Sequence, residues 1–263
     1  MMHLVESDRS QLNRSLSKRW SFGCDMTSVA SRVARLWLFL LAVSTLGAPA
    51  AFGDQFIVKQ NGGGTHTTIQ SAINDASDGD EIIVFPATFL EKINFLGKAI
   101  FVHGTDPSDP DVVDDTVIDA SGAGHVVTFE SGEPSSAVLE GFTIQHGSET
   151  HGGGIYCING ASPTIRRNVI TQNFCVLNGS GIHCSDGASP YIVDNQILEN
   201  FTEGRGGGVF CESSSARIEG NFIAENQAPG SSGGAVHLGA GTDSAIVIGN
   251  TMIGNLAVFG AGI

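Results

Sequence analysis

Basic residues, tryptophan and long apolar runs are all scarce in this sequence. Only 13 of its 263 residues are lysine or arginine, whereas 27 are aspartate or glutamate. From residue 54 onward there are 7 basic and 24 acidic residues, which gives a formal net charge of 7 − 24 = −17. A surface of this sign repels nucleic acid and anionic lipid, so we expect neither as a partner. Both tryptophans lie before residue 54, so the rest of the chain lacks the ring most favoured for stacking on sugars.

The first 53 residues have the parts of a secretory signal. An unbroken apolar run at residues 36–43 follows two arginines and leads into a small-residue exit, Ala48-Pro49-Ala50. The run is too short to cross a bilayer, which needs about 20 apolar residues. We expect residues 1–53 to be an N-terminal extension and signal, with the true start at Met1 or Met26. The mature chain is then secreted or displayed on the cell surface with no membrane span, and a retained anchor is the alternative.

Two motifs repeat along the rest of the chain. The first is glycine-rich, and its copies lie 27 residues apart: GGGIYC at 152, GSGIHC at 179, GGGVFC at 206, GGAVHL at 233 and GAGI at 260. The second, SPTIRRNVITQN at 162–173, is echoed at 189–200, 215–226 and 244–255, and each copy has two asparagines five residues apart. Repetition at such a period is typical of a solenoid.

The pattern within each repeat favours strands over helices. Apolar residues alternate with variable ones, and Gly, Asn, Ser and Thr interrupt the sequence every few residues, so no helical period develops. Short strands joined by tight bends stack each coil, one turn of the solenoid, about 4.8 Å from the next. We therefore predict an all-β fold, a single right-handed parallel β-helix over residues 54–263.

The register sorts the repeats into interior columns. We expect four stacks inside the solenoid: Ile155/Ile182/Val209/Val236, Cys157/Cys184/Cys211/Leu238, Ile165/Ile192/Ile218/Val247 and Ile170/Ile197/Ile223/Met252. Because the cysteine stack ends in leucine, we interpret it as a buried column of thiols. Three thiols in a line do not surround zinc, and in-register neighbours seldom suit a disulfide.

Asparagines at one register predict a ladder at a corner of the solenoid. Asn168, Asn195, Asn221 and Asn250 occupy this position. Asparagine tolerates the left-handed conformation that a sharp bend needs, and its amide can bond to the next asparagine along the axis. The glycine clusters serve another corner, where backbones crowd and φ is positive.

The two ends of the solenoid differ in sequence. Thr67 to Gln70 has the pattern of a capping box. Ile69, Ala72, Ile73 and Ala76 then form one apolar face, so we predict a short helix that caps the N-terminal end. The sequence stops at residues 260–263, one strand into a new coil, and we expect the C-terminal coils to be missing.

A resemblance to a known superfamily supports this fold. The segment TIQSAINDASDGDEIIVFPATFLEKINFLGKAIFVHG at 68–104, followed by TVIDASG at 116–122, resembles the opening coils of the pectin-lyase-like superfamily. Its members are right-handed parallel β-helices and include pectate lyases, pectin methylesterases and polygalacturonases. The later repeats are also similar to those of polymorphic outer-membrane proteins. The resemblance brings no catalytic residue, because the NTD, GHG and RIK motifs of polygalacturonases and the DFIFG and GRPW segments of pectin methylesterases are absent.

One candidate ligand site is a column of rings. Tyr156, His183, Phe210 and His237 alternate with the interior residues, so we expect them to stack on the outer face at coil spacing. Such a ladder could lie against the C–H faces of a linear sugar chain. The alternative is that the stacked rings stabilise the sheet itself or contact a neighbouring loop.

A second candidate is a loop rich in aspartate. Asp106, Asp109, Asp111, Asp114 and Asp115 supply the oxygens that Ca²⁺ prefers, although they lack the spacing of a known calcium loop. The alternative is a solvated turn, in which Asp and Pro are ordinary residues.

The sequence thus leaves two classes of function open. We favour an exported scaffold that binds extracellular polysaccharide or a cell-surface partner, because the repeats are regular and the loops short. The alternative is a polysaccharide-degrading enzyme, a lyase or a glycoside hydrolase, with no identifiable active site.

Overall fold

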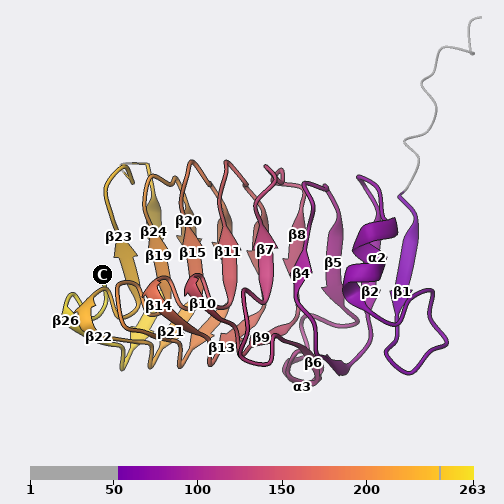
Figure 1. The fold of residues 1–263 in the computed structure, drawn as a ribbon, viewed down its shortest axis with the longest axis horizontal. Helices are drawn as coiled ribbons and strands as arrows, with labels where there is room; N and C mark the ends of the chain where they lie inside the picture. The colour runs from indigo at the N-terminus through magenta and orange to yellow at the C-terminus, as the bar shows by residue number, and fades with distance from the viewer. Residues whose placement is uncertain (1–52, 243) are drawn as a thin grey trace, which may run out of the picture. The chain divides into compact units, whose positions relative to one another are not determined.

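The computed structural model describes residues 53–242 and 244–263. These residues form a parallel β-solenoid whose coils are stacked from β1 to β26 (Figure 1). No helix in these two ranges is long and apolar enough to cross a membrane. The predicted export signal, with its two possible starts, lies outside the described residues.

Two sheets, named A and B here, carry the longest stacks of strands. Sheet A consists of β1 (Gln55–Val58), β2 (Glu81–Val84), β5 (Phe101–Gly104), β8 (Val138–Glu140), β12 (Thr164–Arg166), β16 (Tyr191–Val193), β20 (Arg217–Glu219) and β24 (Ile246–Ile248). Sheet B consists of β3 (Ala87–Phe89), β6 (Thr116–Asp119), β9 (Thr143–Gln145), β13 (Val169–Thr171), β17 (Gln196–Leu198), β21 (Phe222–Ala224) and β25 (Thr251–Ile253).

Two further sheets, C and D, complete the coils. Sheet C consists of β4 (Ile93–Asn94), β7 (Val127–Phe129), β11 (Ile155–Cys157), β15 (Ile182–Cys184), β19 (Val209–Cys211) and β23 (Val236–Leu238). Sheet D consists of β10 (Ser148–His151), β14 (Phe174–Asn178), β18 (Phe201–Thr202), β22 (Gln227–Ser232) and β26 (Leu256–Phe259). The described residues also contain two short helices, α2 (Ile69–Asp75) and α3 (Pro110–Asp115).

The predicted register and interior columns are confirmed. Strands of successive coils pair in parallel with Ile155 opposite Ile182 and Cys157 opposite Cys184. Members of all four columns are fully buried up to Val236, and Leu238, Val247 and Met252 in the last coil are partly buried. A continuous apolar core therefore runs along the axis.

The cysteines form the predicted column of thiols. Cys157, Cys184 and Cys211 are free and buried, as is Cys175. Two causes raise the pKa of the Cys184 thiol: mainly its hydrogen bond with Cys211, and in addition its burial. Thiolates are the reactive form of cysteine, so these side chains act as small apolar groups.

Two asparagine ladders hold the coils together. Asn195 donates from Nδ2 to Oδ1 of Asn221 at 3.0 Å, and its own Oδ1 accepts from the backbone N–H of Asn168 at 3.0 Å. A second ladder runs through Asn173, Asn200, Asn226 and Asn255 with the same pattern. The hydrogen bonding along the axis is as predicted.

The left-handed residue at this corner is not the asparagine, so that part of the prediction is wrong. Positive φ occurs one position earlier, at Arg167 (51°) and Asp194 (53°) in the first ladder. The asparagine side chain points inward, where it bonds to the asparagines of the neighbouring coils and to backbone carbonyls. The residue before it therefore makes the bend. The predicted positive φ of the glycine motif is confirmed, since the first glycine of each copy has it, as at Gly179 (71°).

The predicted N-terminal helix is present as α2. Its N-cap is Thr68, whose side chain accepts from Ser71 N, so the predicted capping box at Thr67 is one residue early. Glu91 accepts from the N–H groups of the first turn at 2.8 and 3.0 Å. Lys98 Nζ donates to three carbonyls at the other end, within 2.7–2.9 Å. Opposite charges thus stand at the two ends of the helix, each sign where the helix dipole favours it.

Candidate ligand-binding groove

The predicted column of rings is present and continuous. The ring of His125 stacks on Tyr156, with centroids 4.2 Å apart. The stack continues through His183, Phe210 and His237 at centroid distances of 5.3, 5.1 and 5.3 Å. The stacking prediction is therefore confirmed.

The expectation that this column faces solvent is wrong for its central members. His183 is 5% exposed and Phe210 is 1% exposed. Sheet D and its connections lie over them: His151 of β10 packs against the His183 ring at 5.0 Å, and His183 Nδ1 is 3.2 Å from the carbonyl oxygen of Asn178 in β14. A Cβ added at Gly179 would lie 2.9 Å from the His183 Cβ, so the backbone of the glycine motif packs closely against His183.

Burial of the ring column has an electrostatic consequence. Desolvation, with the nearby His151 as a further cause, lowers the pKa of His183 to about 4. Burial also lowers the pKa of His237. Both rings are neutral at physiological pH and act as packing groups. Sugar binding by this column stays a prediction, and it requires the covering layer to move.

The predicted calcium ligands are arranged around α3. Asp109 is the N-cap of the helix and accepts from Asp111 N at 3.0 Å, and Asp106 accepts from the N–H and the hydroxyl of Ser108. These hydrogen bonds from Ser108 lower the pKa of Asp106. In the described part of the chain, no three His, Cys, Asp or Glu side chains converge as metal ligands. Two of the five carboxylates thus hold the local turn and helix start.

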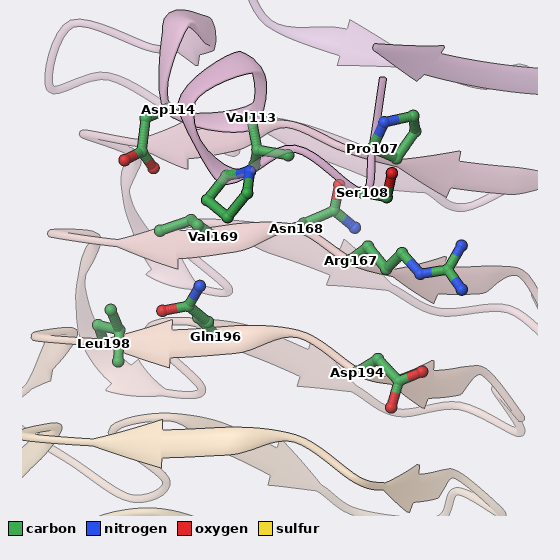
Figure 2. Close-up of a pocket in the computed structure, with 11 residues that line it drawn as sticks. Pro107, Ser108, Val113, Asp114, Arg167, Asn168, Val169, Asp194, Gln196 and Leu198 are labelled. Atoms are coloured by element: carbon green, nitrogen blue, oxygen red, sulfur yellow. The ribbon is translucent and has the colours of Figure 1, made fainter. Parts of the chain in front are cut away.

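A groove lies between α3 and the outer face of sheet B. Its volume is about 500 Å³. Figure 2 shows α3 along one side, with Val113 and Asp114, and strands β13 and β17 as the floor. The lining residues are Pro107, Ser108, Pro110, Val113, Asp114, Arg167, Asn168, Val169, Asp194, Gln196 and Leu198.

The wall of the groove is anchored at two points. Thr143 in β9 donates to the carbonyl of Val113 at 3.1 Å, which ties α3 to sheet B. Pro107 rests on Gly141: a Cβ added there would lie 2.8 Å from the Pro107 Cβ, and its φ is 78°. Only glycine meets both conditions, so this corner of the sheet is adapted to receive the α3 loop.

Arg167 lies at one edge of the groove and forms an ion pair with Glu140. Its Nη1 is 2.7 Å from Oε1 of Glu140, and Nη2 of Arg166 is 2.7 Å from the other oxygen of the same carboxylate. Glu140 is 3% exposed. A buried carboxylate between two arginines is paired on both oxygens, which fixes the guanidinium of Arg167.

The floor combines polar and aliphatic groups from successive coils. Gln196 is exposed and offers both a donor and an acceptor, while Val169 and Leu198 are half-buried. Asp194 lies beside Arg167 at the groove edge, and Asp114 lies at the opposite corner (Figure 2). The two carboxylates thus lie on opposite sides of the floor (Figure 2).

Sequence reasoning found one side of this groove and missed the other. Asp114 was a candidate, for a different role. Arg167, Asp194 and Gln196 were not candidates, although each flanks an asparagine of the first ladder. The residues that flank a ladder asparagine lie at the outer corner of a coil. The asparagine register was therefore the feature of the sequence that could have located them.

The fold and the site define this chain as a parallel β-helix protein with a lateral groove. Residues 93–263, which are 171 of 263 and so more than half of the chain, match a family model described as a right-handed β-helix region. The chain belongs to this family. The match is consistent with the resemblance to the pectin-lyase-like superfamily. Neither the curated proteins nor the solved structures gave a match.

Proposed function

We propose that this protein is an exported scaffold that binds a segment of an extracellular glycan in the groove beside α3. One observation carries the proposal. An open groove of about 500 Å³ presents hydrogen-bonding side chains together with an aliphatic floor. Sites for small polar ligands combine these two kinds of surface, because the apolar part supplies contact area and the polar part fixes orientation.

The repeat supports a linear ligand. Val169 and Gln196 occupy equivalent places on β13 and β17, which pair in register. Coils recur about every 4.8 Å, so a polymer lying along the axis meets side chains at regular steps. Export is part of the proposal and rests on the apolar run that ends before Ala48-Pro49-Ala50.

The test is equilibrium binding of the purified protein to a panel of plant, algal and bacterial glycans, measured by calorimetry. We expect Gln196→Ala to weaken the binding of the best ligand by about 5- to 10-fold, through loss of hydrogen bonds. The matched control is Gln227→Ala, an exposed glutamine on sheet D. Equal effects of the two substitutions, or no binding by any glycan, would contradict the proposal.

The same samples distinguish a scaffold from an enzyme. Each bound glycan is incubated with the protein, with and without calcium, and new reducing ends are assayed. A scaffold leaves the number of reducing ends unchanged. Release of new ends that depends on Asp114 or Asp194 would instead assign a hydrolase or lyase to this groove.

A further inference from the structure

We propose that the groove beside α3 selects uncharged glycans and rejects acidic ones. This inference rests on the proposed function and names the ligand class of the same site. The charges around the groove carry it, because their signs and their fixed positions act differently on the two ligand classes.

The wall formed by α3 and its loop is strongly negative. Asp106, Asp109, Asp111, Asp114 and Asp115 belong to α3 and its loop and are all exposed, and of these five Asp114 lines the groove. The hydrogen bonds at Asp106 and Asp109 hold those carboxylates in place. Asp194 adds a carboxylate at the opposite edge, so acidic groups stand on both sides of the groove (Figure 2).

The two arginines beside the groove, Arg166 and Arg167, are both paired with Glu140. Glu140 is shared between Arg166 and Arg167, so this trio carries a formal charge of 2 − 1 = +1. The two aspartates that line the groove, Asp114 and Asp194, bring the formal charge to 1 − 2 = −1, and the other four of α3 and its loop bring it to −1 − 4 = −5. Nη1 of Arg167 is paired with Glu140, so the one arginine among the lining residues is partly neutralised before any acidic ligand arrives.

The two ligand classes respond differently to this field. A uronate polymer carries a carboxylate on every sugar and would bring like charges against Asp114 and Asp194. The hydroxyls of a neutral glycan donate to these same carboxylates, which are strong acceptors. The amide of Gln196 and the aliphatic surfaces of Val169 and Leu198 serve both classes equally. The aspartates are thus the groups that discriminate.

The test measures the ratio of affinities for neutral and galacturonate oligosaccharides of equal length, with a chelator present and at low ionic strength. We expect the unmodified protein to prefer the neutral series. In the double variant Asp114→Asn/Asp194→Asn the preference should fall by about tenfold, because two like charges near the ligand are removed. Affinity for the neutral series should itself fall by several-fold, because an amide oxygen is a weaker acceptor than a carboxylate, while affinity for the galacturonates should rise.

Two controls complete the design. Asp186→Asn removes an exposed carboxylate that lies on the turn after sheet C, and it should leave the ratio unchanged. Raising the salt concentration should shrink the effect of the double variant, since exposed charges are screened over about 10 Å at 0.1 M. Tighter binding of galacturonates than of neutral glycans, or an unchanged ratio in the double variant, overturns the inference while the proposed function stands. No binding of either series overturns both.

Discussion

Removal of one central asparagine should cost far more stability than its size suggests. Asn195 is 1% exposed and makes bonds to three neighbouring segments. Its Nδ2 donates to the carbonyl of Ile165 at 2.9 Å and to Oδ1 of Asn221 at 3.0 Å, and its Oδ1 accepts from Asn168 N at 3.0 Å. In Asn195→Ala, the Ile165 carbonyl and the Asn168 N–H each lose this bond while remaining buried.

The loss of stability can be worked out from these two buried groups, the Ile165 carbonyl and the Asn168 N–H. Each buried polar group left without its partner costs about 1–3 kcal/mol, so the free energy of unfolding should fall by about 2–6 kcal/mol. The control is Asn250→Ala in the last coil. Asn250 makes the same kind of bonds but is half-buried, so water can replace part of what is lost, and the loss should be less than half as large.

The assay is equilibrium denaturation followed by circular dichroism and tyrosine fluorescence. Coincident transitions test whether the coils unfold together, which a solenoid with strong coupling between neighbours should do. A fall of less than about 1 kcal/mol in the free energy of unfolding of Asn195→Ala would refute the reasoning, since even one unpaired buried polar group costs more than that. Equal costs at positions 195 and 250 would refute the role of burial.

Three further predictions concern other parts of the molecule. Lys98→Met should destabilise α2 by about 1–2 kcal/mol, because it leaves the last carbonyls of the helix without their charged donor, and amide exchange in α2 should rise more than elsewhere. The free energy of unfolding should fall as pH drops from 6.5 to 4, because His183 binds a proton in the unfolded chain but stays neutral in the folded one, where its pKa is about 4. The loss from this group approaches about 3 kcal/mol and should be absent in His183→Phe, which melting curves at several pH values will show. Gly141→Ala should displace the Pro107 loop and cost about 1–3 kcal/mol with loss of glycan binding, whereas Gly160→Ala has open space and tests the backbone strain alone.

The repeat made most of the fold predictable. A strict spacing of glycine motifs and asparagine pairs fixes strand register, and register fixes which residues point inward, so the columns through Ile155, Cys157, Ile165 and Ile170 followed directly. The ladder bonds followed from the same alignment. The bend position did not, although Gly220 and Gly249 occupy it in the later copies, because Arg167 has no preference for left-handed backbone and adopts it only since the next residue must face inward.

The site was less predictable, for two physical reasons. Sheet D comes from segments such as Ser148–His151 and Phe174–Asn178, which have no shared motif, so contact of the rings with a neighbouring segment could be stated only as the alternative. The segment around Asp109 was expected to be an aspartate-rich loop. Asp109 and Pro110 instead start a short helix that forms the wall of the groove, a tertiary placement that no local pattern encodes.

The groove beside α3 is the proposed place of ligand binding. Methyl NMR during titration with a bound oligosaccharide reports this directly, because Val113, Val169 and Leu198 line the groove and carry methyl groups. We predict that the largest shift changes occur at these three residues, with little change at Ile155 and Val209 beneath the ring column. The largest changes at the ring column instead, or an even spread over all the coils, would contradict the assignment of the groove.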